Sequence, residues 1–382
     1  MDGVSRIIHS ARLVDGGTET PGAWIRSERG RVTASGAGDE WRALPADEIV
    51  DAQEVAGEGA LLTPGFIDLH GHGGGGRAHE EGADAIRAAR ALHLAHGTTR
   101  AVISLVAGSL TDLQARLGII ADLTHADASV LGAHLEGPFL DRGHHGAHDP
   151  DLLIAPTPDA VDALIAAARG ALVQVTLAPE LPGAIEAIAR MTRAGVVVAV
   201  GHTSADADLT REAFDAGATL LTHAFNAMPG LHHRAPGPVG AATGDPRVTV
   251  EVIADGVHVH RDVIRILFAA APGRVALVTD AMAAAGAADG TYRLGSLAVT
   301  VEAGVARLAD GTIAGSTLTQ DAALRTAVAA GVALPAAVAA LTSTPARTIG
   351  RPELGSLAVG AVADAVLLDA DLQARQVFTG TV

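Results

Sequence analysis

The sequence predicts an α/β protein, a (β/α)8 barrel of the TIM type with a small β-sandwich domain built from both chain ends. Three observations lead to this fold class. Eight apolar runs of strand length follow one another, Ala-rich segments with helical periodicity separate most of them, and short apolar alternations occur near both ends. We expect residues 1–62 plus 350–382 to form the β domain and residues 63–349 to form the barrel.

Both ends of the chain show the two-residue alternation of half-buried strands, interrupted by Gly-rich turns. In the first 62 residues this pattern predicts short antiparallel strands. The tail alternates in the same way, so we expect it to join the N-terminal strands. The segments concerned are Arg6–Ile8, Arg12–Val14, Ala23–Ile25, Arg31–Ala34, Ala363–Leu368 and Ala374–Val377.

The middle of the chain alternates between predicted strands and predicted helices. The eight strands are expected at Phe66–Leu69, Arg100–Val106, Val130–Leu135, Leu172–Leu177, Val196–Val200, Thr219–Thr222, Val248–Ile253 and Val275–Val278. The helices between them are expected at Ala83–Ala95, Leu110–Leu123, Pro158–Ala168, Pro182–Arg193 and Ala207–Asp215. After the eighth strand, turn signals within Gly286–Ile313 predict an inserted hairpin, and helices are expected at Thr319–Ala330 and Pro335–Thr342.

Composition excludes several classes of function. The chain of 382 residues carries 27 basic and 43 acidic side chains, a net charge of −16, which argues against a nucleic-acid partner. It contains no Cys and no Lys, so thiol chemistry, a Schiff-base lysine and a carbamylated lysine between two metals are all excluded. No apolar run approaches the roughly 18 residues that span a membrane, and no signal-peptide pattern is present. We therefore expect a cytoplasmic protein without a membrane partner.

Polar side chains cluster just after the predicted strands. In barrels the carboxyl ends of the strands form the active-site face. A single buried histidine is usually a core residue with a backbone hydrogen bond, but six strands that each deliver a histidine or carboxylate at one end indicate a metal site of imidazole and carboxylate ligands. These residues are Asp68, His70, His72, His134, Glu136, His202, His223, Asp255, His258 and Asp280.

The pair His70-Gly71-His72, within PGFIDLHGH, directly follows the first predicted strand. With two later strand-end histidines and a strand-end aspartate, it resembles the amidohydrolase superfamily, whose barrels hydrolyse amides and esters with one or two divalent metals. Many members bridge the metals with a carbamylated lysine and some use a cysteine, both absent here. Another branch uses a glutamate after the third strand, the position of Glu136.

Finer motifs resemble the N-acetylglucosamine-6-phosphate deacetylase family over essentially residues 60–350. In order along the chain they are HLEGPFL (134–140), GAHDP (146–150), GHTSA (201–205), THAFNAMP (222–229), ADGVHV (254–259), TDAM (279–282) and AGSTL (314–318). The one Asn of the chain, Asn226, falls within THAFNAMP.

The resemblance implies a role for each matching residue. It makes Glu136, His202 and His223 ligands of the catalytic metal, Asp280 the acid and base, and His148 the group that polarises the acetyl carbonyl. It assigns the sugar phosphate to Asn226, the Ala227 backbone, Arg234 and His258, with part of that site supplied by a neighbouring subunit, which implies a homodimer. His70 and His72 favour a second ion, bridged by Glu136 and close to Asp280.

The expected reaction is hydrolysis of the acetamide of N-acetyl-D-glucosamine 6-phosphate to glucosamine 6-phosphate and acetate. N-acetylgalactosamine 6-phosphate, or another N-acyl amino sugar, is the alternative substrate. One or two divalent ions per chain are expected, with zinc first and iron, cobalt or manganese as alternatives. Two other classes of function fit the sequence less well. A non-catalytic barrel is expected to lack some metal ligands, and none is missing here. A protein that only transports or senses a sugar phosphate does not need a site that generates hydroxide. His145, His232 and His233 receive no role and are interpreted as loop histidines.

Overall fold

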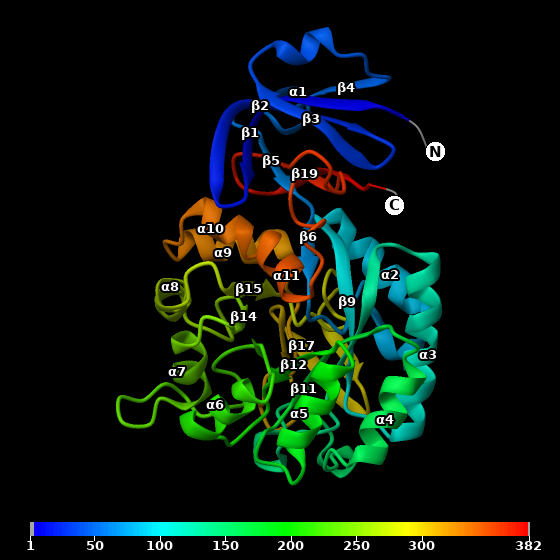
Figure 1. Ribbon diagram of the computed structural model, residues 1–382, viewed down its shortest axis with the longest axis vertical. Coiled ribbons are helices and arrows are strands. Elements are labelled where there is room, and N and C mark those ends of the chain that lie inside the picture. The colour runs from blue at the N-terminus through cyan, green and yellow to red at the C-terminus, as the bar shows by residue number, and fades with distance from the viewer. Residues whose placement is uncertain (1–3, 381–382) are drawn as a thin grey trace.

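The computed structural model describes residues 4–380, and its central element is a nearly closed barrel of eight parallel strands (Figure 1). Most of the strand residues are buried because helices cover the outside and side chains fill the inside, which explains their nearly continuous apolar sequences. The predicted fold class is confirmed. In spatial order the strands are β6 (Phe66–Asp68), β9 (Thr98–Val106), β10 (Val130–Glu136), β11 (Leu172–Leu177), β12 (Val197–Val200), β13 (Leu220–Leu221), β14 (Thr249–Ile253) and β15 (Val275–Val278).

The barrel closes between its first and last strands in two ways. At the amino ends Ile67 donates to the carbonyl of Leu341 at 2.8 Å, so the chain that follows the short helix α10 (Leu334–Ala339) reaches the gap beside β6. At the carboxyl ends the backbone N–H of Asp280 donates to the carbonyl of His70 at 2.8 Å. The second contact brings the two histidines after β6 next to the aspartate after β15.

Helices between the strands cover the barrel, and several begin at side-chain caps. Ser109 and Thr157 accept hydrogen bonds from the backbone N–H groups of the first helical turns that they precede. The helices are α2 (Ala83–Ala95), α3 (Leu110–Ala126), α4 (Pro158–Ala167), α5 (Ala184–Arg193), α6 (Ala207–Asp215), α7 (Gly237–Gly244) and α8 (Arg261–Ala270). The sequence analysis did not predict α7, whose residues GPVGAATG have little helix propensity and no amphipathic period.

Both chain ends contribute to one seven-stranded sheet, shown in blue and red in Figure 1. Its strands are β1 (Arg6–Asp15), β2 (Thr18–Glu28), β3 (Arg31–Ala37), β4 (Glu48–Asp51), β5 (Leu61–Pro64), β19 (Ala365–Leu368) and β20 (Ala374–Phe378). Register shifts along β1 between Ile8 and Leu13 interrupt its ladder with β2, and residues from both chain ends share one apolar core.

One detail of this sheet differs from the prediction. The N-terminal strands β1, β2 and β3 pair antiparallel as expected, but β4 and β5 both run parallel to β1. Parallel pairing requires a crossover, and the turns of η1 (Glu40–Ala43) and α1 (Ala52–Ala56) provide the returning chain. The exact division into residues 1–62 plus 350–382 and residues 63–349 stays a prediction.

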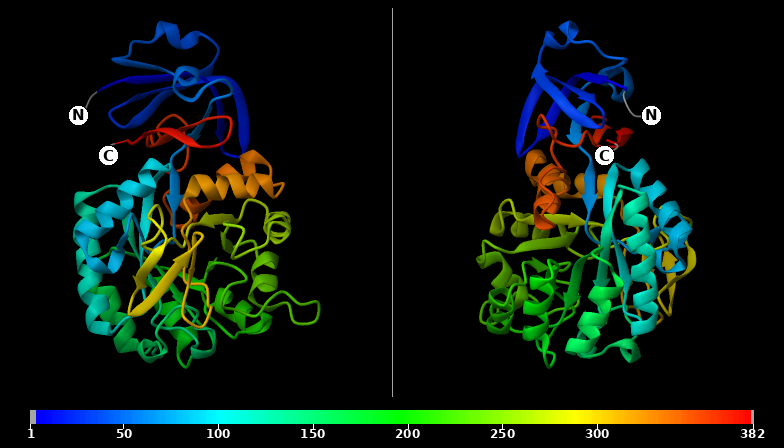
Figure 2. Two further views of the ribbon diagram at one scale, coloured as in Figure 1. Left: turned by 180° about the vertical axis from the view of Figure 1, so that it is seen from behind. Right: turned by 45° about the vertical axis from the view of Figure 1, so that its right-hand side comes forward.

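The remaining elements lie against the barrel. A separate antiparallel sheet of β16 (Gly290–Leu294), β17 (Leu297–Glu302) and β18 (Val305–Arg307) forms the predicted insertion, in yellow in Figure 2. Helices α9 (Gln320–Ala329), α10 (Leu334–Ala339) and α11 (Ser343–Thr348) lie where the barrel meets the β domain. Among residues 4–380, no helix combines the length and the apolar character needed to cross a membrane.

Candidate metal centre

A cavity of about 370 Å³ opens at the carboxyl ends of the barrel strands. Most of the predicted site residues line it, although the first and the last of them, His72 and Asp280, are 208 positions apart in the sequence. They are His72, Glu136, His148, His202, His223, Asn226, Ala227, His258 and Asp280. His70 is completely buried directly beside this group.

Glu136, the last residue of β10, is the common neighbour of the buried histidines. Its Oε1 atom lies 3.2 Å from His202 Nε2 and 3.0 Å from His223 Nε2. The two imidazole nitrogens lie 3.0 Å from each other. The three residues assigned to the catalytic metal therefore converge on one point.

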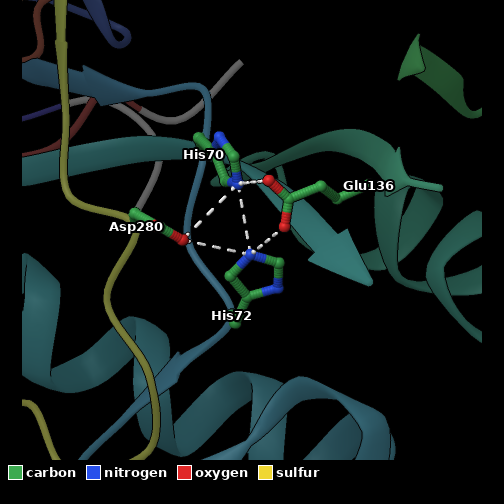
Figure 3. Close-up of side chains that lie close together, drawn as sticks. All are labelled: His70, His72, Glu136 and Asp280. Carbon is green, nitrogen blue, oxygen red and sulfur yellow. Dashed lines mark hydrogen bonds and ion pairs between the residues drawn. The ribbon is translucent and has the colours of Figure 1, made fainter. Parts of the chain in front are cut away.

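A second group of side chains, His70, His72 and Asp280, shares the carboxylate of Glu136 (Figure 3). His70 Nε2 lies 3.1 Å from Glu136 Oε1, and His72 Nε2 lies 3.1 Å from Glu136 Oε2. Asp280 Oδ1 lies 3.5 Å from His70 Nε2 and 3.2 Å from His72 Nε2. His70, His72, Glu136 and Asp280 can each offer one atom to a single ion, and all four are buried.

Hydrogen bonds on the far side of two imidazole rings determine which nitrogen faces the cavity. His202 Nδ1 donates to the carbonyl oxygen of His144 at 2.9 Å, which leaves Nε2 with a free lone pair toward Glu136. His148 Nδ1 instead accepts from the backbone N–H of Ala107 at 3.2 Å, so its proton sits on Nε2. His202 is therefore suited to bind a metal and His148 to donate a hydrogen bond, although both rings face the same cavity.

The electrostatics of the cavity favour a cation. Burial alone would raise the pKa of Glu136, but the surrounding imidazoles, His70 first, hold it well below its usual range. Burial also opposes ionisation of Asp280, yet His70 and His72 lower the pKa of Asp280 to about 2. Conversely, desolvation disfavours charge on His72, but Asp280 and Glu136 raise its pKa to about 9. Both carboxylates are thus ionised at neutral pH and attract positive charge.

The donor set fits a divalent metal. It consists only of imidazole nitrogens and carboxylate oxygens, which suit zinc and other first-row ions. Two pairs of Nε2 atoms, 3.2 Å apart in His70 and His72 and 3.0 Å apart in His202 and His223, point at one another, a crowding that a shared cation would relieve. The backbones of His202, His223 and Asp280 have φ values of 48°, 22° and 48°, an unusual conformation for such residues that clusters at this site.

Three of the four residues assigned to the sugar phosphate line the same cavity. Asn226 is anchored through its side-chain amide, which donates to the carbonyls of His223 and Ala224 at 3.2 Å each. His258 Nδ1 lies 2.6 Å from Asp255 Oδ2. Burial opposes the effect, but this carboxylate raises the pKa of His258 and favours its cationic form, which would attract a phosphate.

Arg234 is the exception. It lies on the exposed loop between β13 and α7, which extends away from the barrel (Figure 1), and it does not line the cavity of its own chain. The rings of His232 and His233 pack together on the same loop, with centroids 4.2 Å apart. His145 is partly buried and donates from Nδ1 to the carbonyl of His148, so it supports the loop that carries His148.

Sequence reasoning missed one charged residue of the site. Glu251 lies within β14, is completely buried, and contacts His70 Nδ1 through Oε2 at 3.2 Å. Gln174 on β11 donates from Nε2 to Glu251 Oε1 at 3.0 Å. The available signal was a charged residue in the middle of VTVEVI, an otherwise apolar predicted strand whose residues 249–253 are all buried in the structure.

Comparison with known proteins agrees with this geometry. The amidohydrolase family profile matches residues 61–381. The chain is 39% identical to an N-acetylgalactosamine-6-phosphate deacetylase of Escherichia coli O157:H7, covering 91% of this chain and 95% of that protein. It is 35% identical to an N-acetylglucosamine-6-phosphate deacetylase of Vibrio furnissii, covering 87% of this chain and 86% of that protein.

Solved structures show the same relationship. A Mycobacterium smegmatis N-acetyl-D-glucosamine-6-phosphate deacetylase variant, in complex with N-acetyl-D-glucosamine 6-phosphate, superimposes with a TM-score of 0.92 at 42% identity, covering 100% of this chain and 98% of that one. The Pasteurella multocida N-acetylglucosamine-6-phosphate deacetylase gives a TM-score of 0.92 at 27% identity, with 98% of each chain covered. The chain therefore belongs to the amidohydrolase family and, within it, to the N-acetylglucosamine-6-phosphate deacetylase family.

Proposed function

We propose that this chain hydrolyses the acetamide of N-acetyl-D-glucosamine 6-phosphate, giving glucosamine 6-phosphate and acetate, with a divalent metal held in the barrel cavity. The main support is the convergence of Nε2 atoms of buried histidines and Asp280 on the carboxylate of Glu136, in a chain that is 42% identical to a deacetylase solved with this substrate. Lys and Cys are absent from the chain, so a metal site that hydrolyses amides must take its side-chain ligands from His, Asp and Glu, the residues found here.

Glu136, His202 and His223 would hold the catalytic ion, and His70 and His72 would hold a second one bridged by Glu136. We propose zinc first, with iron, cobalt or manganese as alternatives that accept the same ligands. A bound divalent ion supplies Lewis acidity, which makes water a stronger acid and polarises a carbonyl.

The remaining chemistry falls to side chains of the cavity. The Nε2–H of His148 would donate to the acetyl oxygen as negative charge develops there, a contact worth about 3 kcal/mol in the transition state. Its pKa is lowered to about 4 because burial outweighs the attraction of Glu136, so the ring is a neutral donor with one fixed proton. A neutral donor at this position does not compete with the metal for negative charge in the ground state.

Asp280 would move the proton. The attacking water loses a proton to the Asp280 carboxylate, the new C–O bond forms, and the same proton passes to the nitrogen as the C–N bond breaks. An amide nitrogen leaves poorly unless it is protonated, so this transfer is the reason for a carboxylate at the cavity wall. Asp280 is ionised at neutral pH, so a carboxylate oxygen is free to take the proton.

Asn226, the Ala227 backbone and His258 would bind the sugar phosphate from within the chain. Arg234 would complete this site in the cavity of a neighbouring subunit, because its exposed loop projects away from its own barrel. A homodimer is therefore part of the proposal. We also propose that the protein acts in the cytoplasm.

N-acetylgalactosamine 6-phosphate is the second candidate substrate, favoured by the 39% identity to a deacetylase of that sugar over 91% of this chain. The two sugars differ only at the hydroxyl of C4. A coupled acetate assay tests both, using N-acetylglucosamine and N-acetylgalactosamine, each with and without the 6-phosphate, on metal-free and metal-restored protein. Metal-dependent acetate release from the phosphorylated sugars is expected, and no release from any of them would refute the proposal.

A further inference from the structure

A buried carboxylate lies directly behind the metal centre without facing the cavity. Glu251 on β14 has no solvent exposure, and among residues 4–380 no Arg lies within ion-pair distance of it. A buried charge is costly unless hydrogen bonds satisfy it. The carboxylate of Glu251 accepts from three donors, namely the Nδ1–H of His70 at 3.2 Å, the backbone N–H of His223 at 3.4 Å, and the amide of Gln174 at 3.0 Å.

The contact with His70 determines the state of that ring. The Oε2 atom of Glu251 already accepts from the backbone N–H of His223, so it faces His70 as an acceptor and the proton lies on Nδ1 of His70. When a metal binds, Nε2 is the nitrogen that would give up its proton and present a lone pair to the space between Glu136 and Asp280. A carboxylate that accepts from the far side of a ligating imidazole also makes the ring a stronger ligand.

His72, the other histidine of this group, has no such support. Its Nδ1 atom is buried, and no residue in the described part of the chain forms a hydrogen bond with it or fixes its tautomer. The catalytic-ion ligand His202 is oriented by a backbone carbonyl at 2.9 Å rather than by a side chain. Among residues 4–380, Glu251 is thus the one carboxylate that orients a histidine of the His70–His72 group from behind. Its contact with the catalytic-ion group is limited to the backbone N–H of His223.

We infer that Glu251 is a positioning residue for a second ion: it holds His70 as an Nε2 ligand and thereby decides whether the His70–His72 group binds metal in addition to the catalytic site. Gln174 orients Glu251 in turn, since its amide donates to the oxygen that does not contact His70. The inference rests on the proposed metal centre, but it concerns the number of ions that each chain binds rather than the reaction itself.

The test is zinc binding by equilibrium dialysis of metal-free wild-type protein and the Glu251→Gln variant. Wild-type protein should reach two zinc ions per chain. The variant should keep the tighter ion and bind the second about 10- to 100-fold more weakly, the usual cost of losing such a partner. The control is Asp321→Asn, which removes another buried carboxylate, on α9, and should still bind two ions.

Three results would overturn the inference: a variant that binds both ions as tightly as wild type, a variant that loses both ions equally, or wild-type protein that saturates with one ion. None of these depends on acetate release, so failure here is separate from failure of the proposed reaction. If Glu251→Gln does not fold, nitrogen NMR of zinc-loaded wild-type protein decides. A slowly exchanging proton on Nδ1 of His70, absent in His70→Asn, is expected, and a proton on Nε2 would overturn the inference.

Discussion

Buried charge is treated differently at the two ends of the barrel. At the amino ends, Arg100 on β9 meets Asp364 just before β19, with Nε–Oδ2 at 2.6 Å and Nη2–Oδ1 at 3.0 Å. Both side chains are about 4% exposed, and Arg100 also donates to the carbonyls of Ala128 and Gly380. The two opposite charges balance each other, and the Nε, Nη1 and Nη2 atoms of Arg100 all donate to an acceptor. The pair therefore links the β domain to the barrel.

At the carboxyl ends, among residues 4–380, no Arg balances the buried carboxylates. Asp68, Glu136, Glu251 and Asp280 are all less than 9% exposed; in this part of the chain the last three pair with histidines only, and Asp68 forms no ion pair. Burial raises the pKa of Asp68 to about 6, the expected response of a carboxyl without a cationic partner. The counter-charges here are histidines, which can give up their protons and bind a metal ion in their place, so the site suits a metal cation. Mutations at the carboxyl ends of the strands should therefore lower metal binding and activity. Mutations at the amino ends should lower the free energy of unfolding.

The largest effect is expected for His202→Ala. This change removes one ligand that converges with His223 on Glu136, so most of the metal and nearly all of the acetate release should be lost. Elemental analysis of the purified variant and the acetate assay measure the two quantities, and circular dichroism checks that the barrel remains folded. An unchanged metal content would remove His202 from the ligand set.

Asp280→Asn should be the next most severe change. The variant keeps the size of the side chain but cannot accept a proton, so kcat should fall by about 10²- to 10⁴-fold while the substrate still binds. Titration calorimetry with N-acetylglucosamine 6-phosphate measures binding, and the acetate assay measures turnover. Activity within a few-fold of wild type would exclude Asp280 as the acid and base.

The opposite end is tested by Asp364→Asn. Removing one partner leaves Arg100 buried without its counter-charge, which should lower the free energy of unfolding by about 3 to 5 kcal/mol. Acetate release per folded molecule should stay near wild type, because the pair lies at the far end of the barrel. The control is Glu353→Gln, which breaks the exposed pair with Arg351 and should cost at most about 1 kcal/mol. Urea unfolding measures both, and equal losses would contradict the role of the buried pair.

Much of the barrel was predictable from sequence because its strands are buried on both faces and read as short apolar runs. The predicted strand Leu172–Leu177 and helix Ala83–Ala95 match β11 and α2. Two features lacked such a signal. The helix α7 (Gly237–Gly244) has glycines where an amphipathic stripe would be, and the parallel pairing of β4 depends on where the intervening chain crosses, which residue patterns do not encode.

The same distinction applies to the site. Side chains that follow a strand, such as His202 and Asp280, were predicted because the strand ends share one face of a barrel. The structure brings these side chains together in one cavity. Their roles in the reaction stay predictions. Glu251 was missed because it lies in the middle of a strand. Its link to the site is its contact with the ring of His70, which the sequence does not show. The opposite tautomers of His148 and His202 depend on single backbone contacts that only coordinates reveal.

The smallest and most selective effect is expected for Arg234→Ala. A guanidinium can bind a phosphate through two parallel hydrogen bonds, and a chain with a net charge of −16 needs such a group to attract a dianion. Because Arg234 lies outside the cavity of its own chain, this contact requires a second subunit. Loss of a charge-assisted contact buried in the complex should cost about 2 to 5 kcal/mol, and only for a substrate that carries the phosphate.

Accordingly, Arg234→Ala should lower kcat/KM for N-acetylglucosamine 6-phosphate by well over tenfold and leave the slow hydrolysis of N-acetylglucosamine nearly unchanged. The matched control is Arg211→Ala on α6, an exposed Arg paired only with Asp208, which should change neither substrate. Zinc content should stay at the wild-type value, because the metal ligands are untouched. If both substrates lose activity equally, Arg234 acts through folding or subunit contact, and the phosphate must then be bound by Asn226, Ala227 and His258 alone. Selective loss would instead support a phosphate site to which this chain's cavity contributes Asn226, Ala227 and His258 and a neighbouring subunit contributes Arg234.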